Sequence, residues 1–334
     1  MDVFIEGIGG AFRQTPGSLG IWNDLHFTSD PEIAKTASWC FVFNEPANPF
    51  VTRAPLPQRV LFASEPPWLR KYPARYTNQF GVVIGPPDLK KFRGRHVRAQ
   101  PCIPWFFGGD GSFLGHSRQL DFDDLCALSF PDKKYPVSVV CSNRSGTTQY
   151  DRRLAFVRAL KEELGEDLHW FGRGFRPVGD KSEAIIPYRY HIVLENNTIP
   201  HFWTEKLADA FLGDAFPIVA GGSHFDDYFP SDSFEYVDLE NIEAAVAKVV
   251  ALVRKDVWAE RYPAIRTARE RLLYEHNIFA VCANYIAENT KPDSSCLSKP
   301  AKIKPLYSPG YRRFRVQRKH VRHWLRRTFP YGIF

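Results

Sequence analysis

The sequence predicts two α/β domains, each built around a parallel β-sheet, followed by a basic tail. The chain has 334 residues, which is enough for two domains of ordinary size. Short apolar runs that end in polar loops recur along it, a pattern typical of strands buried in parallel sheets. Between residues 188 and 222, two such runs flank a helical pattern and predict a β-α-β unit.

Bulk properties exclude several other classes of protein. The hydrophobic fraction of 44% is ordinary for a globular protein, and no apolar run approaches the ~18–20 residues needed to cross a bilayer. Asp2 and Glu6 occupy an N-terminus without the basic and long apolar regions of a signal peptide, so we expect none. The six cysteines are scattered without a C-x-x-C pair, which argues against zinc and disulfides and favours the reducing cytoplasm.

The excess of positive charge lies in the tail. Of the 44 Lys and Arg residues, 11 fall within residues 299–334, which contain no Asp or Glu. The other 33 basic residues stand against all 37 acidic residues in the rest of the chain, so the body carries a net charge of −4. Only the tail therefore suggests an anionic partner.

Four short apolar runs predict the strands of the first domain. Two of them are followed by a carboxylate, Glu45 or Glu65, and the proline after each prevents the strand from continuing. A carboxylate at a strand end is usually solvated, and the residues alone favour that interpretation. The runs lie at 3–8, 39–43, 60–63 and 82–84, in a domain expected to span residues 1–132.

Two later segments of this domain carry chemistry of interest. The Lys and Arg residues between 90 and 98 are interpreted as a solvated loop. The aromatic segment 101–109 either stacks on sugar rings in a cleft or packs between the domains, and the sequence favours neither. A helix predicted over residues 122–128 leads into a linker at 129–136.

An arginine pair suggests phosphate binding in the second domain, residues 133–292. A β-branched strand at 137–141 runs through a polar, glycine-containing loop into a helix over residues 150–164. Arg152 and Arg153 are expected in the first turn of this helix, where guanidinium groups can bind phosphate oxygens in pairs. The alternative is that both are surface arginines.

The β-α-β unit places polar groups at a strand-to-helix junction. The strand at 190–194 ends in the polar run 195–197, and Thr204 is the predicted N-cap of the next helix. Lys206 would lie near an anion held by that helix N-terminus. The residues alone divide evenly between such a ligand site and an ordinary β-α-β unit. Helices over 240–253 and 257–287 complete the predicted second domain.

The same segment resembles the donor-binding signature of a known enzyme family. That signature is an apolar strand, E-N-[ST], a variable loop, Y-[VI]-T-E-K, a helix and an apolar strand ending in glycine. Here it reads L-E-N-N over 194–197, F-W-T-E-K over 202–206 and P-I-V over 217–219 before two glycines. The chain thus resembles the bacterial type of α-1,3/4-fucosyltransferase, glycosyltransferase family 10, strongly over 135–290 and weakly over 35–130.

The resemblance implies a GT-B arrangement, in which two Rossmann-like domains face a central cleft. The first domain would bind an acceptor and the second GDP-fucose, and fucose would move with inversion to an acceptor hydroxyl. The expected acceptor is O3 of GlcNAc or glucose in an N-acetyllactosamine-like oligosaccharide or glycolipid. The resemblance implies no required cofactor and no metal site, and leaves open stimulation by a divalent cation.

Site residues are implied by the same resemblance. Glu65, in a strand-end motif that resembles one in the family's first domain, is the implied catalytic base, with Glu45 as the competing candidate. The family usually has Tyr at position 202, so the Phe of this chain keeps the ring and loses the hydroxyl contact. Donor contacts are implied for Arg153, Asn196, Phe202, Glu205 and Lys206, with Lys181 and Arg152 as further candidates.

The tail, residues 293–334, allows three interpretations. Phe314, Val321, Trp324 and Leu325 would form an apolar edge on a basic helix, as in helices that lie on anionic membrane surfaces. The same residues suit a nucleic-acid arm, and a solvated terminus is the simplest alternative. Since an enzyme acting on a lipid-linked glycan must reach the bilayer, we expect a cytoplasmic protein peripheral to the inner face of the membrane, and no nucleic acid.

Two other functions stay open from the sequence. A GT-B transferase could use another nucleotide sugar, because the residues do not distinguish GDP-fucose by mechanism. The chain could also be a non-catalytic protein that binds glycans or membranes.

Overall fold

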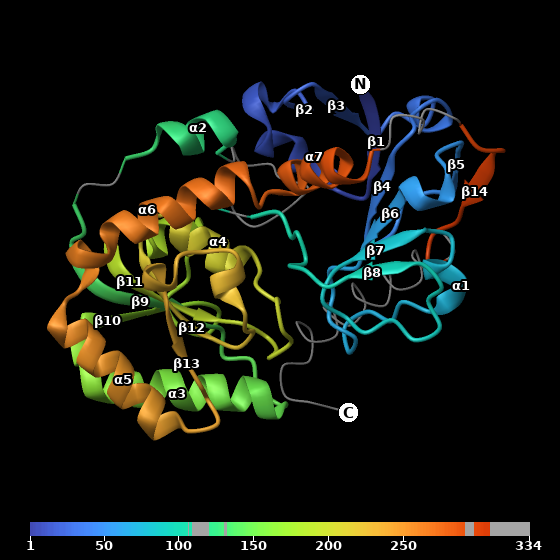
Figure 1. The fold of residues 1–334 in the computed structure, drawn as a ribbon. Helices are drawn as coiled ribbons and strands as arrows, with labels where there is room; N and C mark the ends of the chain where they lie inside the picture. Colours follow the sequence, from blue (N-terminus) through green and yellow to red (C-terminus); the bar gives the residue numbers. More distant parts are fainter. Residues whose placement is uncertain (106, 109–119, 130–131, 291–296, 308–334) are drawn as a thin grey trace, which may run out of the picture.

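Two parallel sheets, one in each half of the chain, organise the structure. The computed structural model describes residues 1–105, 107–108, 120–129, 132–290 and 297–307. Figure 1 shows two α/β domains side by side, with the long helix α6 (Trp258–Tyr274) and the helix α7 (Ile278–Asn289) running from the second domain to the first. The predicted architecture of two Rossmann-like domains is confirmed.

The first domain has a mainly parallel sheet of seven strands in the order β2-β3-β1-β4-β6-β7-β8. Every pairing is parallel except that of β2 with β3. The four predicted strands are confirmed as β1, β4, β6 and β7. The strands are β1 (Asp2–Glu6), β2 (Ile21–Trp22), β3 (Leu25–Thr28), β4 (Cys40–Phe43), β6 (Arg59–Phe62), β7 (Val82–Ile84) and β8 (Arg95–Val97).

The second domain has five strands, all parallel, in the order β10-β9-β11-β12-β13. The apolar runs of the central strands β11 and β12 are buried on both faces, as a parallel sheet covered by helices requires. The strands are β9 (Tyr135–Val140), β10 (Leu168–Phe171), β11 (Tyr188–Leu194), β12 (Phe216–Ala220) and β13 (Glu235–Val237), and the helices α3 (Thr148–Leu164), α4 (Glu205–Leu212) and α5 (Ile242–Lys255) follow the predicted order.

The basic segment 90–98 was predicted to be a solvated loop, but part of it forms a strand. Arg95–Val97 forms β8, which pairs with β7 at the edge of the first sheet. Charged side chains are well tolerated on edge strands, where they face water and oppose pairing with other chains. The positive charge therefore did not exclude a strand.

The single helix predicted over 257–287 is also wrong, because two helices cover that span. Asn277 starts a separate helix after α6 by capping α7. Its Oδ1 accepts hydrogen bonds from the backbone N–H groups of Phe279 and Ala280, both at 2.9 Å. An Asn at an N-cap starts a new helix by satisfying its first donors. The shorter helix predicted near 122–128 is confirmed as α2 (Phe122–Ala127).

Helix α7 packs against the first domain rather than the second. The Phe279 ring lies 5.7 Å from Phe12 and 5.3 Å from Phe27, and the Tyr285 ring lies 6.0 Å from Trp39. Strand β14 (Ala301–Ile303) then pairs antiparallel with β5 (Phe50–Thr52). The chain thus crosses between the domains and returns, while the predicted boundaries at 132 and 292 stay predictions.

The aromatic segment 101–109 packs between the domains where it is described. Trp105 and Phe107 are both buried, at 2% and 1% exposure. Phe107 lies close to Gly213 at the end of α4, where an added Cβ would come within 3.1 Å of the ring. Of the two interpretations that the sequence left open, these rings support packing, not sugar stacking.

The predicted basic amphipathic helix of the tail lies outside the described residues, which end at 307. Within the described ranges, no helix combines the length and apolar character needed to cross a membrane.

Candidate active site

The carboxyl ends of β11 and β12 form the floor of the candidate site. The polar run 195–197 leaves β11 there and packs against two glycines that follow β12. Gly221 has a φ of +89°, and an added Cβ would lie 2.5 Å from the carbonyl oxygen of Asn197. The Gly222 N–H donates to the same oxygen at 2.8 Å. The glycines that close the predicted motif are therefore needed for this close approach.

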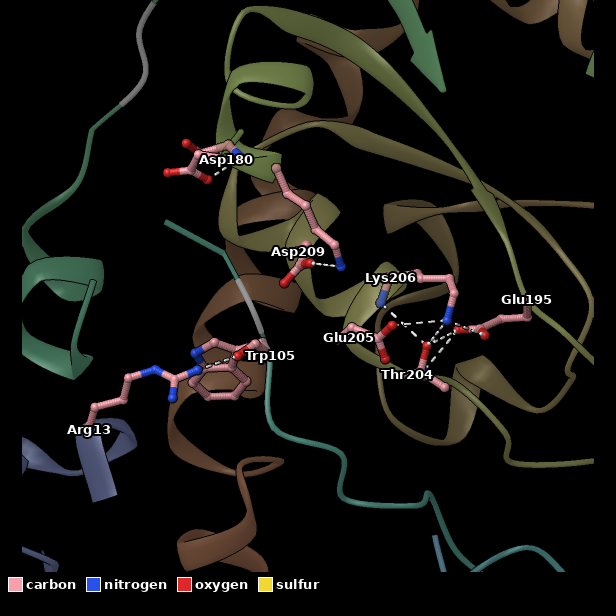
Figure 2. Close-up of polar contacts among 10 residues, drawn as sticks. Arg13, Trp105, Asp180, Glu195, Thr204, Glu205, Lys206 and Asp209 are labelled. Carbon is pink, nitrogen blue, oxygen red and sulfur yellow. Dashed lines mark hydrogen bonds and ion pairs between the residues drawn. The ribbon is translucent and has the colours of Figure 1, made fainter. Parts of the chain in front are cut away.

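A buried carboxylate, Glu195, joins this loop to the start of α4. Its Oε1 accepts from the backbone N–H of Thr204 at 2.9 Å and from the Thr204 hydroxyl at 2.6 Å (Figure 2). The Thr204 Oγ1 in turn accepts from the Lys206 N–H, so Thr204 is the N-cap that the sequence predicted. The loop and helix are held in one geometry because the Glu195 side chain is fully buried.

Lys206 lies between two carboxylates at this helix N-terminus. Its Nζ is 3.0 Å from Glu205 Oε1 and 3.4 Å from Glu195 Oε2, and Figure 2 shows how the three side chains lie. Burial alone would raise the pKa of Glu205, but the charges of Lys206 and Lys181 outweigh it and bring the pKa to about 2. Burial would lower the pKa of Lys206, and Glu195 and Glu205 outweigh it, so that pKa is raised. Glu205 and Lys206 are therefore both charged at neutral pH.

A second ion pair extends the charged cluster along α4. Lys181 Nζ lies 2.8 Å from Asp209 Oδ2, and the Asp209 side chain is 1% exposed. Burial would lower the pKa of Lys181, but Asp209 and Glu205 raise it overall. A cavity of 170 Å³ is lined by Lys181, Lys206, Glu205 and Asp209. The sequence candidate Lys181 is thus brought to the same site as Glu205 and Lys206.

Arg153 approaches the site from α3. Its Nη1 donates to the Asn196 side-chain oxygen, and its guanidinium lies 5.7 Å from the Tyr150 ring centroid. Within the described part of the chain, no carboxylate lies within ion-pair distance of it, and its buried Nε has no hydrogen-bond partner. Arg153 therefore brings a positive charge that no neighbouring carboxylate neutralises, which is what binding of an anion requires.

Arg152 and Arg153 lie two residues deeper in the helix than predicted. Thr147 caps α3, which begins at Thr148 and not at residue 150, so the pair falls in the second turn. The two side chains diverge, because Arg152 forms an ion pair with Glu240. Of the pair, only Arg153 reaches Asn196.

Glu65 comes from the first domain, just after β6. Its N–H donates to the Tyr72 hydroxyl at 3.2 Å, and that hydroxyl donates to the side chain of Asn44 after β4. Burial raises the pKa of Glu65, Arg70 lowers it, and the charges of Glu205 and Lys206 act on it from the second domain; the net effect is a raised pKa. The carboxylate of the first domain is thus within electrostatic reach of the Lys206 cluster.

Glu45, the competing candidate for the base, is engaged elsewhere. Its Oε1 forms an ion pair with Arg70 at 3.0 Å, and its Oε2 accepts from the Tyr307 N–H at 3.3 Å. A carboxylate whose two oxygens are held by a cation and a backbone donor is less available to an acceptor hydroxyl. The geometry favours Glu65.

Phe202 is placed differently from the other predicted donor contacts. Its ring is buried, at 3% exposure, and its carbonyl oxygen lies where a Cβ on Gly222 would meet it at 2.4 Å. Contact between this ring and a nucleotide would require the ring to become accessible.

Two contributors to the cluster were not predicted as site residues. Glu195 was part of the matched motif, but its role depends on burial, which spacing does not reveal. Arg13 reaches the domain interface from the first domain, where its Nη2 donates to the Trp105 carbonyl at 2.7 Å and its charge acts on Asp209 (Figure 2). An arginine in a glycine-rich loop after β1 was the available signal.

Comparison with protein-family models finds a match over the second domain. Residues 130–291 match the model of glycosyltransferase family 10 (fucosyltransferase), C-terminal part. The second domain is therefore similar to this family. Within the described residues, no group of three or more His, Cys, Asp and Glu side chains is placed to hold a metal ion.

Individual proteins match over shorter stretches. The 4-galactosyl-N-acetylglucosaminide 3-alpha-L-fucosyltransferase 9 of Homo sapiens is 29% identical over 123 residues, 35% of this chain and 34% of the relative, and that of Mus musculus gives the same values. The chain thus matches about a third of the length of these curated relatives. A crystal structure of an alpha1,3-fucosyltransferase with GDP-fucose aligns over 90% of this chain and 92% of its own, with a TM-score of 0.47 and 19% identity.

Proposed function

We propose that the protein is a fucosyltransferase that moves fucose from GDP-fucose to a glycan hydroxyl. The observation that carries this proposal is that a carboxylate of the first domain lies within electrostatic reach of the charged cluster at the start of α4 in the second domain. Glu65 of the first domain has a raised pKa and feels the charges of Glu205 and Lys206 in the second. The similarity of the second domain to family 10, and the donor motif within it, support fucose as the transferred sugar.

The chemistry proposed is a single displacement with inversion. The acceptor oxygen bonds to the anomeric carbon of β-linked fucose as the bond from that carbon to the GDP oxygen breaks, which leaves an α-fucoside. Glu65 takes the proton of the acceptor hydroxyl, because a carboxylate with a raised pKa is the better general base. The expected hydroxyl is O3 of GlcNAc or glucose in an N-acetyllactosamine-like acceptor.

The departing diphosphate needs positive charge as the bond to fucose breaks. Arg153 supplies it most directly, since no described carboxylate neutralises it. Lys206 contributes from the N-terminus of α4, where its position is fixed by Glu195 and Glu205. These fixed charges support transfer without a required cofactor, and addition of EDTA or of a divalent cation to the assay tests that part of the proposal.

The cellular setting is proposed from the sequence alone. We infer a cytoplasmic enzyme that is peripheral to the inner face of the membrane and acts on a lipid-linked or soluble oligosaccharide. The basic residues of the tail support this inference. Sedimentation of the chain with anionic vesicles, compared with a variant that ends at residue 307, tests it.

A panel of nucleotide sugars tests the main proposal. Release of free nucleotide should occur with GDP-fucose in the presence of N-acetyllactosamine, and Glu65→Gln should abolish it while GDP still binds. Glu45→Gln is the matched control and should retain turnover. Consumption of another nucleotide sugar alone would identify a different transferase, and glycan binding without turnover of any donor would identify a non-catalytic protein.

A further inference from the structure

Two large apolar side chains are exposed beside the proposed base. Trp68 is 59% exposed and Leu69 is 62% exposed, in the turn that follows Glu65. The turn is closed by hydrogen bonds from the N–H groups of Leu69 and Arg70 to the Pro66 carbonyl, at 2.9 and 3.0 Å. Exposed tryptophan is uncommon on protein surfaces without a binding role, and neighbouring exposed apolar side chains strengthen that indication.

The turn is anchored to the sheet at both ends. On one side, the Glu65 N–H donates to the Tyr72 hydroxyl, which donates to the side chain of Asn44 just after β4. On the other, Arg70 forms the 3.0 Å ion pair with Glu45 at the end of β4. Trp68 lies three positions after Glu65 in the sequence, so their Cα atoms are at most about 11 Å apart. The exposed pair is therefore held close enough to the proposed base for one short oligosaccharide to contact both.

The other aromatic side chains considered for sugar contact are unavailable. Trp105 and Phe107 are buried between the domains. An acceptor saccharide presents one face of C–H groups that carry partial positive charge, and the indole face carries negative charge density. Stacking of a pyranose on an exposed indole therefore combines apolar burial with electrostatic attraction.

We propose that Trp68, flanked by Leu69, is the platform on which a pyranose ring of the acceptor stacks, so that the reacting hydroxyl points toward Glu65. This inference rests on the proposed function and adds an acceptor-binding residue to it. Because Trp68 and Glu65 belong to one anchored turn, the platform and the base move together. The donor residues all lie in the second domain, so this contact contributes to acceptor binding alone.

Kinetics of Trp68→Ala test the platform. The KM for N-acetyllactosamine should rise about tenfold, which corresponds to a loss of about 1.4 kcal/mol of acceptor binding. The KM for GDP-fucose and the slow release of GDP without acceptor should stay unchanged. Trp68→Phe should restore most of the acceptor affinity. Leu19→Ala, which removes a 65% exposed apolar side chain elsewhere in the same domain, is the control and should change neither KM.

Direct binding separates this inference from the proposed function. Titration of N-acetyllactosamine by calorimetry needs no turnover, so weaker binding by Trp68→Ala supports the platform even if GDP-fucose is not the donor. Equal acceptor binding by the variant and the wild type would overturn it. So would a loss of sedimentation with phosphatidylglycerol vesicles in Trp68→Ala without any change in glycan binding, since the exposed pair would then contact lipid.

Discussion

At the scale of single residues, the candidate site is distinguished by how its charges are paired. Lys206 and Lys181 each have a carboxylate within 3.0 Å, whereas Arg153 hydrogen-bonds a neutral amide. An incoming diphosphate must compete with protein carboxylates for the lysines but not for the arginine. Motif matching could identify these residues, but it could not rank them, because the ranking depends on partners that come from distant parts of the chain.

The pH dependence of turnover should report Glu65. Burial raises the pKa of this carboxyl above its ordinary value of 4.5, and its base function needs the deprotonated form. Activity should therefore be present at higher pH and fall as pH drops through the raised pKa, at a pH above that of an ordinary glutamate. Profiles of kcat/KM against pH measure the pH at which activity is lost on acidification. A midpoint of this loss at or below pH 4.5 would contradict the assignment.

Replacing Arg153 should weaken donor binding selectively. Arg153→Gln removes a charge-assisted contact worth about 1.5–3 kcal/mol, so the KM for GDP-fucose should rise roughly 10-fold to 150-fold. Arg152→Gln is the matched control on the same helix, and because Arg152 pairs with Glu240 it should change this KM little. Similar effects of the two substitutions would remove the distinction between them.

At the scale of elements, the β11-to-β12 unit was predicted almost completely. The strands, the Thr204 cap and the closing glycines all follow from local pattern, because each depends on residues near in sequence. Strand β8 and the break between α6 and α7 could not be predicted in the same way. The first depends on a sheet edge, and the second on one Asn within an otherwise continuous helical pattern.

Glu195 should stabilise the contact between the loop after β11 and the start of α4. Glu195→Gln keeps an acceptor for Thr204 but removes the charge opposite Lys206, which is partly exposed, so we expect a loss of about 1 kcal/mol in the free energy of unfolding. The KM for GDP-fucose should also rise, because Lys206 is no longer held in one position. Denaturant unfolding and donor kinetics measure the two effects, and a change in stability alone would make Glu195 merely structural.

At the scale of the whole molecule, two crossings join the domains. The first is the linker with α2, and the second is the passage from α6 to α7. Arg269 of α6 connects both regions: its Nη1 lies 3.0 Å from Asp214 Oδ1, and its Nη2 donates to the Leu125 carbonyl of α2 at 2.6 Å. Sequence periodicity predicts the two sheets but cannot predict such contacts, since partners more than 140 residues apart carry no local signal.

Loss of Arg269 should therefore destabilise the molecule strongly. Arg269→Met leaves the fully buried Asp214 carboxylate short of a partner, and we expect a cost of about 3 kcal/mol in the free energy of unfolding. Arg266→Met removes a second, 44% exposed, cation that pairs with the same carboxylate and should cost less than about 1 kcal/mol. Thermal or denaturant unfolding compares them, and equal costs would contradict this account of the buried pair.

The pairing of β14 with β5 determines where the last part of the chain starts. Residues 301–303 pair with β5 of the first domain in a separate two-stranded sheet. The Tyr307 N–H donates to Glu45, whose other oxygen forms the ion pair with Arg70 at the end of the turn that carries Trp68. Anything bound by residues 308–334 is consequently tethered to the domain that we assign to the acceptor. A tether raises the effective concentration of whatever it holds near its root. A surface that captured the tail would thus enrich its own glycans at the acceptor side of the enzyme, whatever the intrinsic affinity of that side for a single sugar.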